Sequence, residues 1–259
     1  MTGHQMRQSA ADAAVRATWR SWRETLRRAR ARPRSRRRLH EFRIATRRLQ
    51  AMEQLLAPAR SGRQVIPSAG VEPAFRAAGK LRDIQLCVER LHALRNTHPV
   101  AGTIEAALRA QLPRRERKYE RALREIDVTR CKRAVRALRA NADLQRARRR
   151  LRSRQQRLRS TLRELPAHPT LAQLHRLRLR VKQLRYMQEW IAPAARESAP
   201  PELSYQLPLM QRKLGEIADT RALRRAVERW KPANKCDTRA QARLLRHIRP
   251  PRWNVTGKG

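Results

Sequence analysis

Two short segments of the sequence carry side chains that could act together on a ligand: LHEFRIATRRL at 39–49 and LHRLRLRVKQL at 174–184. In each segment, a histidine is followed by cations three and seven positions later. An α-helix turns by about 100° per residue, so these three side chains fall within roughly 60° of one another. Arginine can hold an oxyanion with two parallel N–H groups. The spacing predicts a cationic row along one helical face, suited to a phosphate-rich ligand.

The two segments form an internal repeat with an offset of 135 residues. The repeat aligns His40 with His175, Arg43 with Arg178, and Arg47 with Lys182. A second pair of segments, GKLRDI at 79–84 and GEIADT at 215–220, aligns Gly79 with Gly215 and Asp83 with Asp219. Descent from a duplicated unit could preserve such a pattern by itself. The histidine and cations match, however, where neighbours such as Glu41 and Arg176 differ, which favours a functional role.

An apolar stripe runs beside each cationic row. The stripes are Leu39, Phe42, Ala45, Leu49, Met52 and Leu56 in the first segment and Leu171, Leu174, Leu177, Val181, Leu184 and Met187 in the second. The cations therefore lie on the shoulder of the core. In a single helix, the simplest interpretation is that the arginines lay their stems on apolar surface and keep their heads in water. Two helices with the same pattern favour a shared basic channel, provided that the helices face each other.

The rest of the chain predicts an all-α protein. Glycine is scarce, with 8 residues, and alternating β-branched runs are missing. Proline and small-residue breaks predict helices over 7–32, 35–57, 73–96, 100–127 with a kink at Pro113, 130–165, 169–191, 203–230 and 238–248. The repeat predicts two four-helix bundle-like halves, 1–128 and 129–259, related by a pseudo-twofold axis, with a central basic channel if the repeated helices face each other.

The charge balance indicates a polyanionic partner. The chain has 63 basic and 21 acidic residues and a formal net charge of +42. Such a chain repels itself unless a polyanion or counterions neutralise it. A genome rich in G and C can explain the preference for arginine over lysine, but it explains the excess of base over acid less well. Non-specific nucleic-acid binding is the alternative function, although aromatic residues for base stacking are only 4% of the chain.

These motifs resemble the CHAD family (conserved histidine α-helical domain) over about residues 5–248. LHEFRIATRRL and LHRLRLRVKQLRY resemble its first pair of motifs, and GKLRDIQLCVERL and LGEIADTRAL its second. The resemblance implies two four-helix bundles and a cavity that binds inorganic polyphosphate. It implies a cavity lining of His40, Arg43, Arg47, Arg48, His175, Arg178, Lys182 and Arg185. Such proteins often read RRLR where this chain has RRLQ, so Gln50 replaces a cation of the first half.

Further residues have weaker claims on the site. Arg36 precedes His40 by one turn, and Arg82 is expected near the same cavity. Asp83 and Asp219 either orient cavity arginines or, as we slightly favour, cap a helix or satisfy a buried arginine. Gly79 and Gly215 are expected to allow close helix packing.

Catalysis is not expected. The ExExK pattern of the triphosphatase domain that accompanies some relatives is absent, and the two segments offer few carboxylates to hold magnesium. A phosphoacceptor histidine is conceivable, but a duplicated histidine among arginines fits a binding wall better. His168 and His175 lack acidic or cysteine partners, so no metal site is expected, and no cofactor.

The remaining residues predict the environment of the protein. The start, MTGHQMRQSA, has no apolar stretch, and no apolar run approaches the roughly 20 residues that cross a bilayer. We therefore expect a cytoplasmic protein, with association with polyphosphate granules as an option, and no membrane partner. The cysteines are expected to be buried free thiols: Cys87, Cys131 and Cys236. The tryptophans are expected in the core, with a homodimer contact as the alternative: Trp19, Trp22, Trp190, Trp230 and Trp253.

Overall fold

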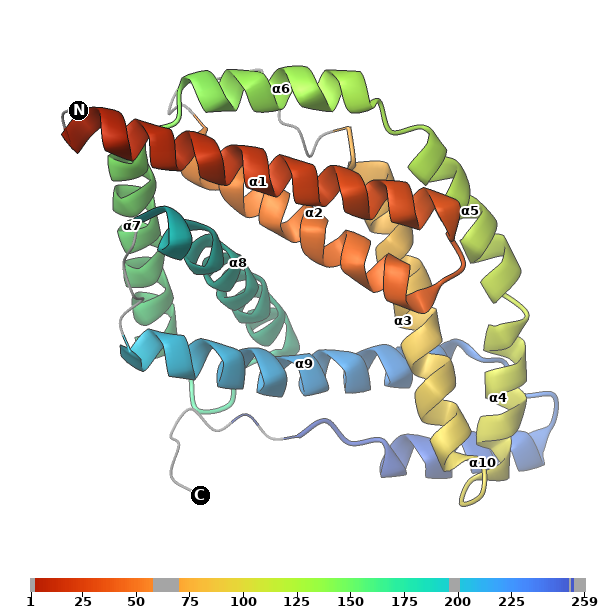
Figure 1. Ribbon diagram of the computed structural model, residues 1–259. Helices are drawn as coiled ribbons and strands as arrows, with labels where there is room; N and C mark the ends of the chain where they lie inside the picture. The colour runs from red at the N-terminus through yellow and green to blue at the C-terminus, as the bar shows by residue number, and fades with distance from the viewer. Residues whose placement is uncertain (1–2, 58–69, 196–200, 252, 254–259) are drawn as a thin grey trace.

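The computed structural model describes residues 3–57, 70–195, 201–251 and 253, and within them every regular element is a helix (Figure 1). The ten helices are α1 Gly3–Ala31, α2 Arg36–Leu56, α3 Glu72–Leu94, α4 Pro99–Arg109, α5 Leu112–Arg124, α6 Val128–Ala140, α7 Leu144–Arg163, α8 Leu171–Ala195, α9 Pro201–Arg229 and α10 Lys235–His247. The prediction of an all-α protein is confirmed. Most of the loose segment expected at 59–73, and half of the linker expected at 193–202, lies outside the described residues.

Two of the segments that we predicted as single helices each contain two helices. The segment predicted at 100–127 divides into α4 and α5, and Pro113 lies in the first turn of α5, where a proline costs no hydrogen bond. The segment predicted at 130–165 divides into α6 and α7. Asp143 caps α7, accepting hydrogen bonds from the N–H groups of Gln145 at 2.8 Å and Arg146 at 3.1 Å. The predicted end of α8 at 191 was also wrong, because the helix continues to Ala195.

The repeated helices are packed against each other. Helix α2 contacts α1, α3, α7 and α8, while α3 contacts α9. Helices α5 and α6 form a connection along the outer edge of the molecule, from α4 at the right of Figure 1 over the top to α7. Four helices thus precede this connection and four follow it, in the order that the repeat predicts. The pseudo-twofold relation between these sets stays a prediction.

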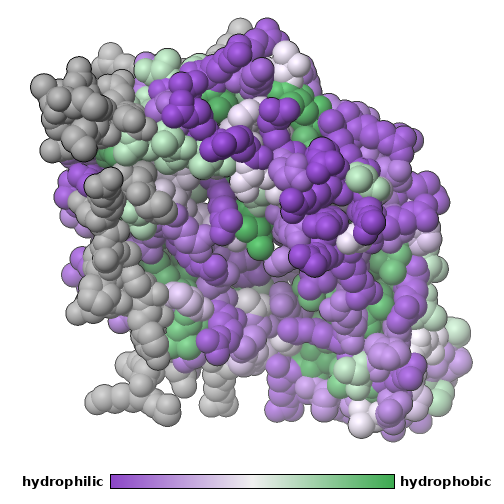
Figure 2. Space-filling model, in the orientation of Figure 1, coloured by the Kyte–Doolittle hydropathy of each residue, from purple (hydrophilic) through white to green (hydrophobic). Residues whose placement is uncertain are grey.

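The hydrophobic core crosses the predicted division at 128. The largest buried cluster joins Trp22, Leu49 and Met52 of the first half to Met187 and Ile191 of the second. The apolar stripe of α2 is buried throughout. The stripe of α8 is buried with one exception, which corrects our prediction: Leu171, in the first turn, is 42% exposed. The face shown in Figure 2 is mostly hydrophilic, with hydrophobic residues in separate patches.

The outcomes for cysteine and tryptophan are mixed. Cys87 and Cys131 are buried and form no disulfide among the described residues, but Cys236 is exposed, contrary to expectation. Three tryptophans are buried, namely Trp19, Trp22 and Trp190. Trp230 and Trp253 are partly buried and pack against smaller clusters. In the described part of the chain, no helix is long and apolar enough to cross a membrane.

Candidate anion-binding site

Four cations from the repeated helices form what we call the central cluster: Arg43, Arg47, Arg178 and Lys182. Helices α2 and α8 pack together, and each helix contributes two of these side chains. Burial lowers the pKa of Lys182 to about 8, and the nearby guanidinium groups of Arg178, Arg47 and Arg43 contribute to this shift. Burial also lowers the pKa of Arg43 and of Arg47, and Arg178 lowers both further. The two cationic rows therefore face each other closely enough to repel.

No carboxylate forms a direct ion pair with the cations of the central cluster to offset their repulsion in the described part of the chain. The Nε atom of Arg178 is buried without a hydrogen-bond partner. A buried donor without a partner typically costs about 1–3 kcal/mol, more for a charged group, so its retention calls for an explanation. An external anion would satisfy both the charge and the donor.

Phe75 and Gly79 of α3 hold the α2 side of the cluster in position. The guanidinium carbons of Arg43 and Arg47 lie 5.2 and 4.6 Å from the centroid of the Phe75 ring, within range of a cation–π interaction. A Cβ atom at Gly79 would lie 2.9 Å from Nη1 of Arg43, so glycine leaves room for this guanidinium. The prediction that Gly215 permits close packing was wrong, because a Cβ there would meet nothing within 4 Å. Neither Phe75 nor this role of Gly79 was predicted.

The other four predicted arginines lie around the cluster, and we call them the rim arginines: Arg36, Arg48, Arg82 and Arg185. Each of them is paired with a glutamate. Glu89 of α3 pairs with Arg36 and, at 3.8 Å, with Arg82. Glu189 of α8 pairs with Arg185 at 2.7 Å and with Arg48 at 3.7 Å. We call Glu89 and Glu189 the glutamate clips, because each holds one arginine from α2 and one from its own helix.

Both predicted histidines are exposed and lie within the field of the cations. Burial lowers the pKa of His40, and so do Arg82, Arg43 and, from the facing helix, Lys182. Burial also lowers the pKa of His175, as do Arg178 and two arginines of α9, Arg221 and Arg225. These two α9 arginines were missed by the sequence analysis. Their signal was the continuation of the second motif, ADTRALRR, by one to two helical turns beyond Asp219.

Asp83 and Asp219 lie inside α3 and α9, which excludes helix capping and leaves the other two alternatives, orienting cavity arginines or satisfying a buried arginine. Asp219 pairs with Arg90 of α3 at 3.6 Å, which ties α9 to α3. The carboxylate of Asp83 reaches solvent but is closely surrounded by protein, and burial raises its pKa. Arg43 and Arg178 oppose that shift, whereas Asp219 adds to it. The second pair of repeated motifs thus places two carboxylates beside the cations of the first.

Recesses lie at both ends of the central cluster. One, of about 190 Å³, is lined by Asp83, His175, Arg178, Asp219, Arg221 and Arg225 together with apolar residues of α8 and α9. The other, of about 220 Å³, is lined by Arg47, Gln50, Ala51, Gln54, Leu179, Gln183 and Tyr186. Gln50 therefore lies at the site, where a cation was expected. In the part of the chain that the structure describes, no three histidine, cysteine or carboxylate side chains gather as metal ligands would.

An all-helical fold with two facing rows of cations defines a helical domain built around a concentrated positive charge. The sequence pattern of the CHAD domain matches residues 10–228, and the chain belongs to this family. The crystal structure of the CHAD domain from the plant Ricinus communis is similar, with a TM-score of 0.67 at 16% sequence identity, over 93% of this chain and 86% of that chain. At this identity, the likeness shows the fold alone. No curated protein sequence matches the chain.

Proposed function

We propose that this protein binds inorganic polyphosphate at the central cluster and does not act on it as an enzyme. The observation that carries the proposal is that four close cations form no direct ion pair with a carboxylate among the described residues, although Asp83 and Asp219 lie near them. The CHAD family is known in general for polyphosphate binding, which supports this choice of anion. A flexible chain with a negative charge at every phosphate can follow a double row of cations.

The binding energy would come from hydrogen bonds between charged groups and from the release of counterions. Arg43 and Arg47, held on Phe75, can present their N–H groups to successive phosphates with little loss of side-chain freedom. The buried Nε of Arg178 would gain its missing acceptor. The carboxylates near the cluster face cations, and Asp219 is paired with Arg90, so they serve to position arginines.

The test is a titration with polyphosphate of defined length, followed by competition with single-stranded and duplex nucleic acid at equal phosphate concentration and moderate salt. Polyphosphate should bind more tightly than either nucleic acid, and its affinity should fall steeply as salt rises. Tighter binding to nucleic acid would replace this proposal with the non-specific nucleic-acid function. The cytoplasmic location, granule association and a homodimer stay predictions; light scattering and fluorescence microscopy of a tagged chain would check them.

A further inference from the structure

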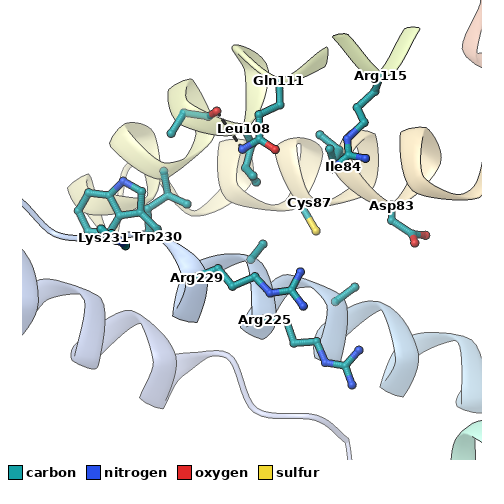
Figure 3. Close-up of a pocket in the computed structure, with 14 residues that line it drawn as sticks. Asp83, Ile84, Cys87, Leu108, Gln111, Arg115, Arg225, Arg229, Trp230 and Lys231 are labelled. Atoms are coloured by element: carbon teal, nitrogen blue, oxygen red, sulfur yellow. Dashed lines mark hydrogen bonds between the residues drawn. The ribbon is translucent and has the colours of Figure 1, made fainter. Parts of the chain in front are cut away.

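A further hollow, of about 400 Å³, lies between α3, the α4–α5 connection and α9 (Figure 3). We call it the Trp230 pocket. Its apolar lining comprises Ile84, Cys87, Ile104, Ala107, Leu108, Ala222, Ala226 and Trp230. Burial, with a contribution from Asp83, raises the pKa of the Cys87 thiol to about 11, so this side chain is a neutral part of the wall. The volume falls within the range of roughly 300–1,000 Å³ typical of small-molecule sites.

Four cations also line this pocket: Arg115, Arg225, Arg229 and Lys231. None of them forms an ion pair with a carboxylate in the described part of the chain. Figure 3 shows Arg225 and Arg229 along α9, across from Cys87 and Asp83 of α3. Asp83 is the one carboxylate of the lining. An apolar wall with four free cations fits an organic anion better than it fits either an uncharged ligand or a bare phosphate chain.

The register of α9 explains this combination. Ala222 and Ala226 are four residues apart, as are Arg225 and Arg229, so each pair occupies one face of the helix. The small alanines leave the hollow open, while the arginines stand at its side. Trp230 lies at one end of the pocket and Asp83 at the other (Figure 3). Asp83, Ala222 and Arg225 also line the recess that contains His175 and Arg178, so the pocket adjoins the candidate phosphate site.

We propose that the Trp230 pocket binds the base and ribose of a nucleoside polyphosphate, with its phosphates on Arg225 and Arg229. The flat base can pack on Trp230 and Leu108, an interaction worth about 1–3 kcal/mol for a base on an aromatic side chain. The Gln111 amide donates to the Ala107 carbonyl at 3.4 Å, which leaves its oxygen able to accept from the ligand. Inorganic polyphosphate has no group that uses these features.

The first experiment compares a nucleoside triphosphate with inorganic tripolyphosphate by calorimetry. Both have three phosphates, and the inorganic ion carries more charge, so charge alone favours it. The nucleotide should nevertheless bind about tenfold more tightly, as expected for one stacked base. Equal or weaker binding of the nucleotide overturns the proposal. Long-chain polyphosphate is titrated in parallel: if it binds while the nucleotide has no advantage, the nucleotide site fails and the proposed function stands.

The second experiment fills the pocket without changing charge. Ala107→Leu introduces volume from an exposed position of α4, and Ala226→Leu does so from α9. Either substitution should remove the advantage of the nucleotide and leave tripolyphosphate binding unchanged. Arg229→Gln should lower the affinity for the nucleotide several-fold. Arg212→Gln removes the same charge from α9 outside the pocket and should change the affinity for either ligand little. If both leucine variants still bind the nucleotide more tightly than tripolyphosphate, the nucleotide does not bind in the Trp230 pocket. Retained binding of long polyphosphate shows that the variants fold.

Discussion

The central cluster and the rim arginines contain the same kind of side chain in opposite electrostatic situations. Around the rim, two glutamate clips pair with four arginines. In the centre, Arg43, Arg47, Arg178 and Lys182 face one another without such a partner among the described residues, and burial lowers the pKa of three of them. The protein pairs the rim cations directly with glutamates, whereas the central cations have only the more distant carboxylates Asp83 and Asp219 near them.

This difference separates stability from function. Exposed ion pairs such as those of the rim contribute little, typically about 0–1 kcal/mol each, but they hold the arginines in place. Cations gathered without counter-charge destabilise the folded protein by mutual repulsion. A fold that retains these cations is less stable without a ligand, and a bound anion would remove the repulsion between them. The centre should therefore dominate binding, and the rim should adjust it.

The largest effect is expected from removing charge in the centre. Arg43→Gln combined with Arg178→Gln should weaken polyphosphate binding by about 100-fold, because each arginine makes charge-assisted hydrogen bonds worth about 1.5–3 kcal/mol. The matched control, Arg36→Gln with Arg185→Gln, removes two rim charges and should cost less than about fivefold, since those arginines are already paired. Calorimetry at fixed salt measures both. Equal losses in the two variants would contradict the distinction between centre and rim.

The same central variant should also affect the protein without ligand. Loss of two mutually repelling charges should leave the melting temperature unchanged or raise it, whereas the rim variant should lower it slightly. A melting temperature that falls sharply only in the central variant would show that Arg43 and Arg178 stabilise the fold.

Lys182 makes the centre sensitive to alkaline pH. Its pKa of about 8 in the free protein should rise when an anion binds, so binding takes up a proton above pH 8. Polyphosphate affinity should consequently fall several-fold between about pH 8 and 9.5. Lys182→Arg, which copies the equivalent Arg47 of the other repeat, stays charged and should show a flat profile over this window. Parallel profiles for the two proteins would exclude Lys182 as the cause.

Lys182 also links folding stability to pH with a defined sign. Its folded-state pKa, about 8, lies below the ordinary value of 10.5, so the unfolded chain binds more protons between these values. Stability attributable to this residue should therefore rise from about pH 8 to 10.5. The difference in unfolding free energy between wild type and Lys182→Arg, measured by urea denaturation, should show this slope. A difference that is constant with pH would contradict it.

Gly79 tests the positioning of the centre. Gly79→Ala would bring a Cβ against Nη1 of Arg43, and the guanidinium would have to move from the Phe75 ring. Polyphosphate affinity should fall by about three- to tenfold, a fraction of one charge-assisted hydrogen bond. Gly215→Ala is the control at the equivalent repeat position, where a Cβ meets nothing within 4 Å. It should leave binding unchanged and stabilise α9 by about 0.5–1 kcal/mol. Equal effects on binding would refute the positioning role of Gly79.

Much of the fold could be predicted because helices leave local signals. Prolines, alanine-rich runs and the apolar stripe of α2 predicted most helices to within a few residues. The division of 130–165 was missed because its cause, a cap by Asp143, is one residue in a strongly basic stretch. Leu171 continues the apolar stripe of α8, yet it lies in the first turn of the helix and stays 42% exposed.

The candidate site was predictable only where the repeat marked it. Each of the six residues that the repeat aligns interacts electrostatically with at least one other: Lys182 with Arg43, Arg47 and Arg178, His40 with Arg43 and Lys182, and His175 with Arg178. The sequence did not show which arginines would be paired with glutamates. Glu89 and Glu189 each contact one arginine of another helix, and their partners on their own helices are seven and four residues away. The contacts of Phe75 with Arg47 and of Arg90 with Asp219 could not be predicted either, because the partners are distant in sequence.

The histidines should extend the comparison to acidic pH with a smaller effect. The pKa values of His40 and His175 are lowered in the free protein, and a bound polyanion should raise them. Binding would then take up protons, so affinity should increase about two- to fivefold as the pH falls from 8 to 5.5, the modest change expected for exposed groups. His40→Gln with His175→Gln should flatten this profile and leave affinity at pH 8 nearly unchanged. A flat wild-type profile would place both histidines outside the site.

The smallest effect should come from releasing the rim. Glu189→Gln removes the carboxylate that holds Arg185 and Arg48, so both guanidinium groups become available to the ligand. The gain in binding energy is partly offset by entropy, because the two unpaired side chains lose conformational freedom when the ligand binds, at about 0.5–1.5 kcal/mol each. The net result should be a two- to threefold increase in polyphosphate affinity and a steeper dependence on salt. Glu228→Gln, which removes the carboxylate paired with Arg224 on α9, is the matched control and should leave the affinity and its salt dependence unchanged. A loss of affinity in Glu189→Gln alone would mean that the clip positions the rim arginines for binding rather than restraining them.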